Sequence, residues 1–270
     1  MTATATDLPP MRRLKLDDRG NGILLVTLSR PEVMNALDTA TLEDMRDLFQ
    51  PLGRDPGGWR CIVLTGAGEK AFCAGGDLKE RQGMTDEQWR AQHAIIEAGA
   101  YALMDCVVPT IAAVNGVAFG GGTELALACD FIYAADTARF GLPEVTRGIM
   151  VAAGASQNLP RAVGERRARE ILMTGQPFTA QEAERWGMVN RLLPAEALLP
   201  AALETAARIA ANAPVSVRQV KRAVRYGWST DIVQGREIEL MAYNATVVTE
   251  DRHEGVNAFN EKRPPVFKGR

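Results

Sequence analysis

The residue types best suited to chemistry stand together in a run of three glycines and a glutamate, Gly120-Gly-Gly-Thr-Glu124. The glycines end a loop and open an apolar helix that we expect over residues 121–129. A helix N-terminus exposes backbone N–H groups that can hold an anion, and glycine has no β-carbon to keep a ligand away. The same run, taken in isolation, is also consistent with a simple tight turn.

Glu124 would lie in the first turn of this helix, where a carboxylate can complement the helix dipole. The five residues that follow, Leu125-Ala-Leu-Ala-Cys129, make the helix apolar nearly all round, so we expect it to be buried. A buried carboxyl without a charge partner is costly to ionise and has a raised pKa. Glu124 is therefore a candidate general acid or base.

A second carboxylate, Glu144, ends the segment Phe140-Gly-Leu-Pro-Glu144. Pro143 restricts the residue before it and suits the start of a helix. Taken alone, this pattern fits an ordinary first-turn glutamate better than a catalytic one.

A third glycine-bearing segment, residues 65–79, follows an expected strand and contains Gly66-x-Gly68-x-x-Ala71. A dinucleotide fingerprint would need a helix to start at once and an acidic residue about 20 positions later. The chain instead runs into Phe72-Cys-Ala-Gly-Gly76, which does not propagate a helix. A nicotinamide cofactor is disfavoured, and a P-loop is excluded because no Gly-Lys-Ser/Thr follows.

The cysteines and histidines give no metal-binding pattern. Four cysteines are far apart, two histidines are present, and no Cys-x-x-Cys spacing occurs, so we expect no zinc site and a reduced, cytoplasmic setting. Neither His93 nor His253 stands in a motif that would activate Cys73, which we interpret as a small core residue.

Composition and charge further limit the class of protein to which this chain can belong. The chain has 270 residues, 31 Lys and Arg against 33 Asp and Glu, and a net charge of −2, with no basic run that would suit nucleic acid. No stretch approaches the roughly 20 apolar residues of a membrane helix. Residues 1–10 lack the features of a secretory signal and are expected to form a disordered tail.

Hydrophobic spacing predicts an α/β core followed by helices. Strands are expected at 12–17, 22–28, 61–65, 109–114 and 130–134, and helices at 39–52, 86–106 and 121–129. After about Pro143 helices dominate, at 167–173, 180–186, 198–213, 215–226 and 231–249. We place the core at residues 11–195 and a helical region at 196–270, with a capping box at Thr179–Glu182.

Five segments, in this order, resemble the enoyl-CoA hydratase/isomerase (crotonase) family over nearly the whole chain. They are Ser29-Arg-Pro-Glu-Val-Met-Asn-Ala-Leu37, Ala71-Phe-Cys-Ala-Gly-Gly-Asp-Leu78, Asn115-Gly-Val-Ala-Phe-Gly-Gly-Gly-Thr-Glu124, Phe140-Gly-Leu-Pro-Glu144 and residues 250–263. The resemblance implies a β-β-α spiral core with a C-terminal helical region for trimerisation, giving a homotrimer or a dimer of trimers. It also implies an acyl-CoA substrate, with no cofactor beyond the coenzyme A that the substrate carries.

By matching motif positions, the resemblance implies an oxyanion hole made by the backbone N–H groups of Gly76 and Gly121. It assigns substrate binding to five further residues: Ala74, Asp77, Leu78, Phe259 and Lys262. The last two would bind coenzyme A, including that of a neighbouring subunit. Family members that resemble hydratases carry glutamates at the positions of Glu124 and Glu144; here Glu124 would mainly activate water and Glu144 mainly supply the proton.

Double-bond isomerisation and thioester hydrolysis stay open on the same fold, as does a binding protein with an inactive site. Two departures from the family pattern concern the substrate. Residues 148–156 lack the usual Pro and Gly-Gly pair near the acyl pocket, and Glu32 replaces a common lysine near the CoA phosphates. Trp89 and His93 are expected to serve in core packing rather than in the acyl pocket.

Overall fold

A six-stranded sheet forms the centre of the computed structural model, which describes residues 10–270. In spatial order its strands are β1 (Leu14–Asp18), β2 (Ile23–Leu28), β3 (Cys61–Gly66), β5 (Thr110–Val114), β7 (Phe131–Ala135) and β10 (Arg191–Leu193). Strand β1 is antiparallel to β2 and the other pairs are parallel. Strands β3 and β5 are buried along their whole length, as parallel strands covered on both faces should be.

A second sheet of four short strands lies beside the first. Its order is β4 (Ala71–Cys73), β6 (Val117–Phe119), β8 (Arg139–Gly141) and β9 (Phe178–Thr179), with β9 antiparallel to β8. Along the chain, β3, β5 and β7 are each followed by a strand of this second sheet. Helices α2 (Asp86–Asp105) and α3 (Gly121–Ala128) then complete two β-β-α turns, which confirms the predicted spiral.

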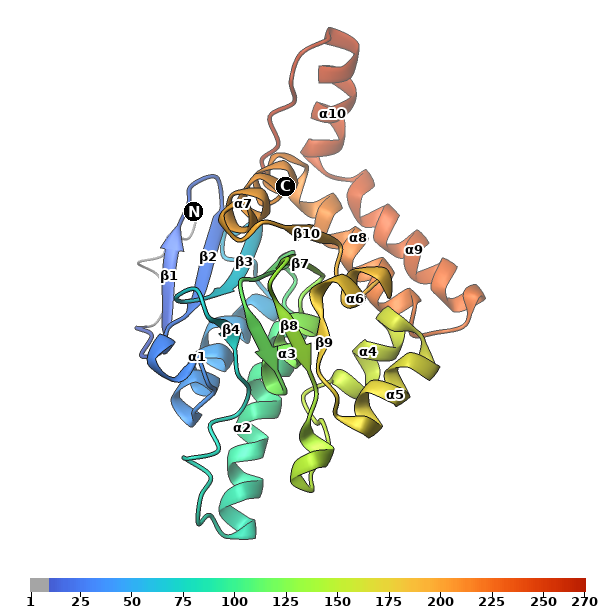
Figure 1. Cartoon of the computed structure of the whole chain (residues 1–270). Coiled ribbons are helices and arrows are strands. Elements are labelled where there is room, and N and C mark those ends of the chain that lie inside the picture. The colour runs from blue at the N-terminus through green and yellow to red at the C-terminus, as the bar shows by residue number, and fades with distance from the viewer. Residues whose placement is uncertain (1–9) are drawn as a thin grey trace.

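The helices of the first half flank these strands. Helix α1 (Thr39–Phe49) packs against α2, and α3 lies against both β4 and β6. Helices α4 (Ala155–Val163), α5 (Glu165–Thr174) and α6 (Ala180–Arg185) form a group on the other side of the molecule (Figure 1). The predicted capping box is present, because Thr179 and Glu182 each bond the other's backbone N–H.

The C-terminal helices differ from one another in their packing. Helix α7 (Ala195–Ala211) buries Leu198, Ala202, Ala206 and Ala210 against β3, β5 and β7, so it completes the core. Helices α8 (Pro214–Gly227) and α9 (Ile232–Val247) pack against each other, and α10 (Glu250–Glu261) projects away (Figure 1). The division predicted at 195/196 falls at the first residues of α7, a helix that packs on the sheet, and the helices α8 to α10 follow α7.

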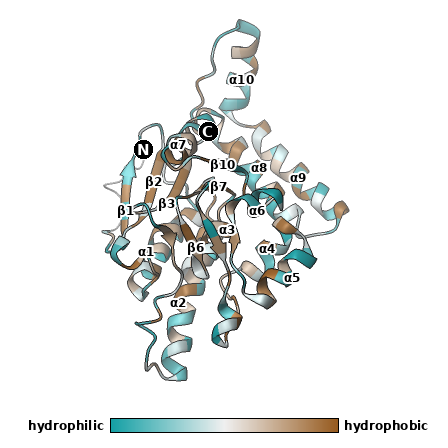
Figure 2. Ribbon diagram, viewed as in Figure 1, coloured by the Kyte–Doolittle hydropathy of each residue, from teal (hydrophilic) through white to brown (hydrophobic). Residues whose placement is uncertain are grey.

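Hydropathy follows this architecture. Apolar residues concentrate on the inner strands β2 and β3, while polar residues dominate the outer end of α2 and much of α10 (Figure 2). Within residues 10–270, no helix is both long and apolar enough to cross a membrane. The tail expected at residues 1–10 falls, apart from Pro10, outside the described residues.

Prediction from the sequence located most elements to within a few residues but missed several, including five short strands. The five strands β4, β6, β8, β9 and β10, and the helices α4 and α10, were not predicted. A strand of three residues is too short to display an alternating pattern, and α4 contains Pro160.

Candidate active site

A cavity of about 250 Å³ lies between the loop after β4, the N-terminus of α3, the first half of α2 and residues 143–153. Six of the residues predicted to form the site line it, namely Ala74, Gly76, Leu78, Gly121, Glu124 and Glu144. Most of the other residues that line the cavity are apolar. The structure therefore gathers into one place residues that are up to 70 positions apart in the chain.

The two predicted oxyanion donors are close neighbours. A β-carbon built on Gly121 would lie 4.0 Å from the Gly76 nitrogen. The Gly75 carbonyl accepts a hydrogen bond from the Leu37 N–H, and the Asp77 N–H donates to the Leu37 carbonyl. The Gly76 N–H, which lies between these two groups in the chain, therefore points away from Leu37. Neither the Gly76 nor the Gly121 N–H has a hydrogen-bond acceptor within residues 10–270. Two unused donors therefore face one cavity.

The glycines around these donors are required by close packing. Gly120 has a φ of 51°, and its N–H donates to the Gly141 carbonyl over 2.8 Å. A β-carbon there would approach Glu144 Oε1 to 2.8 Å, and one on Gly122 would approach the Cys73 carbonyl oxygen to 2.1 Å. The tight-turn interpretation of this run is therefore correct for Gly120 and Gly122, and the approach of a ligand to Gly121 stays a prediction.

Glu124 is buried, with only 5% of its surface exposed, and it borders the cavity. Its Oε1 accepts hydrogen bonds from the backbone N–H groups of Ala153 (2.8 Å) and Ala155 (3.3 Å). Burial raises the pKa of Glu124 to about 7, although the Ala153 hydrogen bond opposes this shift and the charge of nearby Glu144 adds to it. The carboxyl can thus exchange a proton near neutral pH.

Glu144 begins the short 3-10 helix Glu144–Arg147, directly after Pro143, which confirms its predicted first-turn position. Its Oε2 is nevertheless buried and has no hydrogen-bond partner among the described residues. Burial raises the pKa of Glu144, against the opposing effects of its own backbone N–H and of the Arg147 charge. A buried, unpartnered carboxylate oxygen beside a second carboxyl is costly for stability and suited to proton transfer.

We expect Glu124→Gln to be more stable than the unmodified protein at pH 8, by up to about 3 kcal/mol. The unfolded chain loses this proton near pH 4.5 and the folded chain near pH 7, so the folded state loses stability as the pH rises between these values. Urea unfolding at pH 8 and pH 4, at one protein concentration, should show the advantage shrinking at pH 4. The exposed Glu87→Gln serves as a control; an advantage of Glu124→Gln that did not depend on pH would contradict the prediction.

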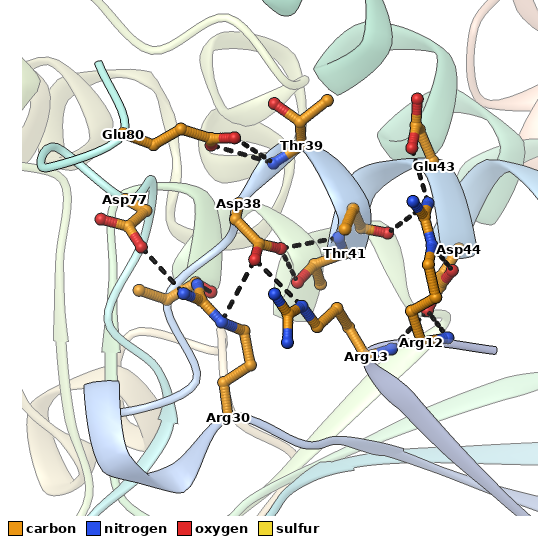
Figure 3. A network of polar contacts seen from close by, with 12 residues as sticks. Arg12, Arg13, Arg30, Asp38, Thr39, Thr41, Glu43, Asp44, Asp77 and Glu80 are labelled. Carbon is orange, nitrogen blue, oxygen red and sulfur yellow. Dashed lines mark hydrogen bonds and ion pairs between the residues drawn. The ribbon is translucent and has the colours of Figure 1, made fainter. Parts of the chain in front are cut away.

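Asp77 does not line the cavity. Its carboxylate accepts a hydrogen bond from Arg30 over 3.0 Å, and Arg30 also pairs with Asp38 at the start of α1 (Figure 3). Burial alone would raise the pKa of Asp38, but hydrogen bonds from Thr41 and the charges of Arg30 and Arg13 lower it. Figure 3 shows how these contacts tie the segment that carries Gly76 to α1. In the single chain, Asp77 positions this segment, and direct contact with substrate stays a prediction.

The structure does not bring Phe259 and Lys262 to the cavity. They lie at the end of α10, and 83% of Phe259 is exposed. They do not line the cavity, so their contact with coenzyme A, including that of a neighbouring subunit, stays a prediction.

Two other expectations concern the cavity walls. Core packing was predicted for Trp89 and His93, and this prediction was wrong, because both residues line the cavity. The His93 Nε2 atom lies 3.1 Å from Glu97 Oε1. Residues 148–156 shape the cavity as expected, through Ile149, Met150, Ala152 and Ala153. No sequence pattern predicts the second role of Ala153, whose backbone N–H donates to Glu124 Oε1.

Cys73 behaves as a core residue. It is fully buried, and burial raises the pKa of its thiol to about 12, against the Gly75 N–H that lowers it. Such a thiol does not ionise near neutral pH. In the described part of the chain no group of His, Cys, Asp and Glu side chains could hold a metal ion.

The spiral of β-β-α turns, the helical C-terminal region and a cavity at the start of α3 together define the crotonase class of folds. The crystal structure of enoyl-CoA hydratase from Bacillus anthracis superimposes with a TM-score of 0.93 at 42% identity, covering 96% of this chain and all of that one. A family model described as enoyl-CoA hydratase/isomerase matches residues 18–270.

Relatives agree with this class. YngF of Bacillus subtilis, whose name places it among enoyl-CoA hydratases/isomerases, is 46% identical over 91% of this chain and 94% of its own length. The 2,3-dehydroadipyl-CoA hydratase of Escherichia coli is 38% identical over 93% of this chain and 97% of its own. The chain belongs to the enoyl-CoA hydratase/isomerase family.

Proposed function

We propose that this protein is an enoyl-CoA hydratase, which adds water across the 2,3 double bond of an acyl-CoA thioester. The observation that carries the proposal is the pairing of two unused backbone donors, at Gly76 and Gly121, with two buried carboxyls in one cavity. As water adds at C3, negative charge gathers on the thioester oxygen and gives an enolate-like state. Two fixed N–H groups stabilise that state more than the uncharged ground state, and this lowers the barrier.

Each of the two carboxyls then carries out one of the two proton transfers. Glu124, held by the Ala153 N–H, orients a water molecule and takes its proton, while Glu144 delivers a proton to C2. In this cycle one of the two carboxyls is protonated and the other ionised. Because the two groups interact, the pair shares its protons, and the roles can exchange when the reaction runs in reverse.

Isomerisation of a 3-enoyl-CoA and hydrolysis of the thioester are the alternatives on this fold. Isomerisation needs a single acid/base that moves a proton between two carbons, so the second buried carboxyl favours hydration. The names of the Bacillus anthracis and Escherichia coli relatives point the same way. We further propose that the reaction takes place in the cytoplasm and requires no cofactor beyond the coenzyme A of the substrate.

Loss of the conjugated enoyl-thioester absorbance tests hydration directly, with crotonyl-CoA first and then with longer and branched enoyl-CoAs. We expect turnover without added metal or nicotinamide. Two parallel assays, conversion of 3-enoyl-CoA and release of free thiol, report the alternatives. Activity in either of these assays with none in the first would replace the hydratase proposal.

We also propose that the chain assembles as a homotrimer or a dimer of trimers through its C-terminal helices. These helices expose large apolar side chains: Val220, Val224, Tyr226, Trp228, Ile232, Val233, Leu240, Met241, Tyr243, Val248 and Phe259. An apolar surface of this extent marks an association site. Light scattering after size exclusion should give three or six times the chain mass of 29.3 kDa, whereas a stable monomer would contradict the assembly.

A further inference from the structure

An arginine lies next to the oxyanion site. The Arg81 guanidinium is 3.7 Å from the position of a β-carbon on Gly76, and its Cζ is 4.5 Å from the centre of the Trp89 ring. Arg81 lines the same cavity as Trp89, His93 and Ile96. A cation thus stands on an otherwise largely apolar wall, a few ångströms from one of the two proposed oxyanion donors.

The guanidinium is held in place from one side. Its Nε donates to Gln92 Oε1 over 2.9 Å, and Gln92 is itself buried and bonds Thr39 and Glu80 through its amide nitrogen. Glu80 is the nearby opposite charge, but its carboxylate is taken by Gln92 and by the Thr39 N–H. Stacking and this hydrogen bond fix the plane of the Arg81 side chain.

The other edge of the guanidinium is unused. Within residues 10–270, the hydrogen bond of Arg81 is made through its Nε, neither terminal nitrogen has a hydrogen-bond acceptor, and Arg81 forms no ion pair. Burial lowers the pKa of Arg81, against the charge of Glu80, which raises it. Two parallel N–H donors in a rigid plane match the two oxygens of a carboxylate.

We propose that Arg81 binds a carboxylate at the far end of the acyl chain, so that the preferred substrate is an enoyl-CoA derived from a dicarboxylic acid. This inference rests on the proposed acyl-CoA chemistry of the same cavity. Bond lengths place the guanidinium at most about 10 Å from a thioester oxygen held by Gly76. An acyl chain of no more than roughly five or six carbons is therefore long enough to bring its carboxylate to the Arg81 fork.

The phosphates of coenzyme A are the other anions that such a ligand carries. They are separated from the thioester by the whole pantetheine arm, whereas Arg81 stands beside the thioester site. The acyl carboxylate is therefore the anion that fits the position, and the experiment must separate the two.

Binding of inert saturated thioesters tests the inference without any turnover. We expect calorimetry to show that glutaryl-CoA binds at least about tenfold more tightly than pentanoyl-CoA, which has the same chain length without the carboxylate. Arg81→Met should abolish this ratio, and Arg81→Lys should retain part of it because lysine keeps the charge but loses the planar fork. Arg90→Met, the same change at an exposed position of α2, should leave the ratio intact.

Hydration rates of glutaconyl-CoA and trans-2-pentenoyl-CoA give the second readout. The ratio of their kcat/KM values should favour glutaconyl-CoA and fall by roughly 10- to 100-fold in Arg81→Met. Equal binding of glutaryl-CoA and pentanoyl-CoA by the unmodified protein would overturn the inference. So would equal weakening of both ligands, and of free coenzyme A, in Arg81→Met, since that assigns Arg81 to the phosphates. A binding preference without hydration would leave Arg81 assigned and refute only the hydratase proposal.

Discussion

Replacing either carboxyl, by Glu124→Gln or Glu144→Gln, should lower kcat for hydration by about 10²- to 10⁴-fold. Glutamine keeps the shape and an acceptor oxygen for the Ala153 N–H, but it can neither take nor give a proton. The double variant should be little worse than the more damaged single variant, because the two groups act as one unit. Initial rates with crotonyl-CoA at saturation, together with KM, measure the effect.

Two controls distinguish a loss of catalysis from a loss of folding. Far-ultraviolet circular dichroism should show all variants folded, and the exposed Glu87→Gln should retain the activity of the unmodified protein. An inactive Glu124→Gln beside a fully active Glu144→Gln, or the reverse, would argue for a single acid/base. Such a result would move the assignment from hydration toward isomerisation.

The second large effect is expected when the backbone N–H group of Gly121 is removed. Gly121→Pro removes one of the two oxyanion donors, and we expect kcat to fall by about 10²- to 10³-fold. Gly121 is the first residue of α3, where proline is tolerated because its missing N–H would have no partner within the helix. Loss of activity should therefore exceed any loss of stability.

Gly121→Ala is the matched control. It adds a β-carbon, which meets Leu37 Cδ1 at 3.0 Å, but it keeps the N–H group. The difference between the alanine and proline variants isolates the donor from the added carbon. If both variants lost activity equally, crowding against Leu37 would explain the result and the oxyanion role of Gly121 would be refuted.

Local patterns in the sequence were sufficient for the long elements and for the chemistry of individual residues. The α2 helix was predicted at 86–106 and is observed at Asp86–Asp105, because twenty residues display their spacing clearly. The burial of Glu124 followed from its apolar neighbours alone. The ordered set of five motifs was enough to identify the family, and three of them contain glycines or carboxylates that line the cavity.

Some contacts between distant segments were not indicated by the sequence. Trp89 and His93 were expected in the core. The buried residues of α2 are, however, concentrated in its second half. Its first half extends past the sheet and lines the cavity. Helical spacing is the same in both halves, so it cannot tell which half meets the core. Arg81 was overlooked for a similar reason, because an arginine in a loop has the ordinary pattern of a solvated residue.

The sequence was thus sufficient for the carboxyls and glycines of the site and for the order of most of the longer strands and helices. Both follow from local chemistry, namely side-chain polarity, backbone freedom at glycine and helical period. The resemblance to the family implied that the Gly76 and Gly121 N–H groups converge. Only the tertiary structure showed that Glu144 Oε2 has no hydrogen-bond partner within residues 10–270 and that Arg81 faces the same space. Such proximity arises from the parallel pairing of β4, β6 and β8, three-residue strands that are defined by their neighbours in space and not by their own residues.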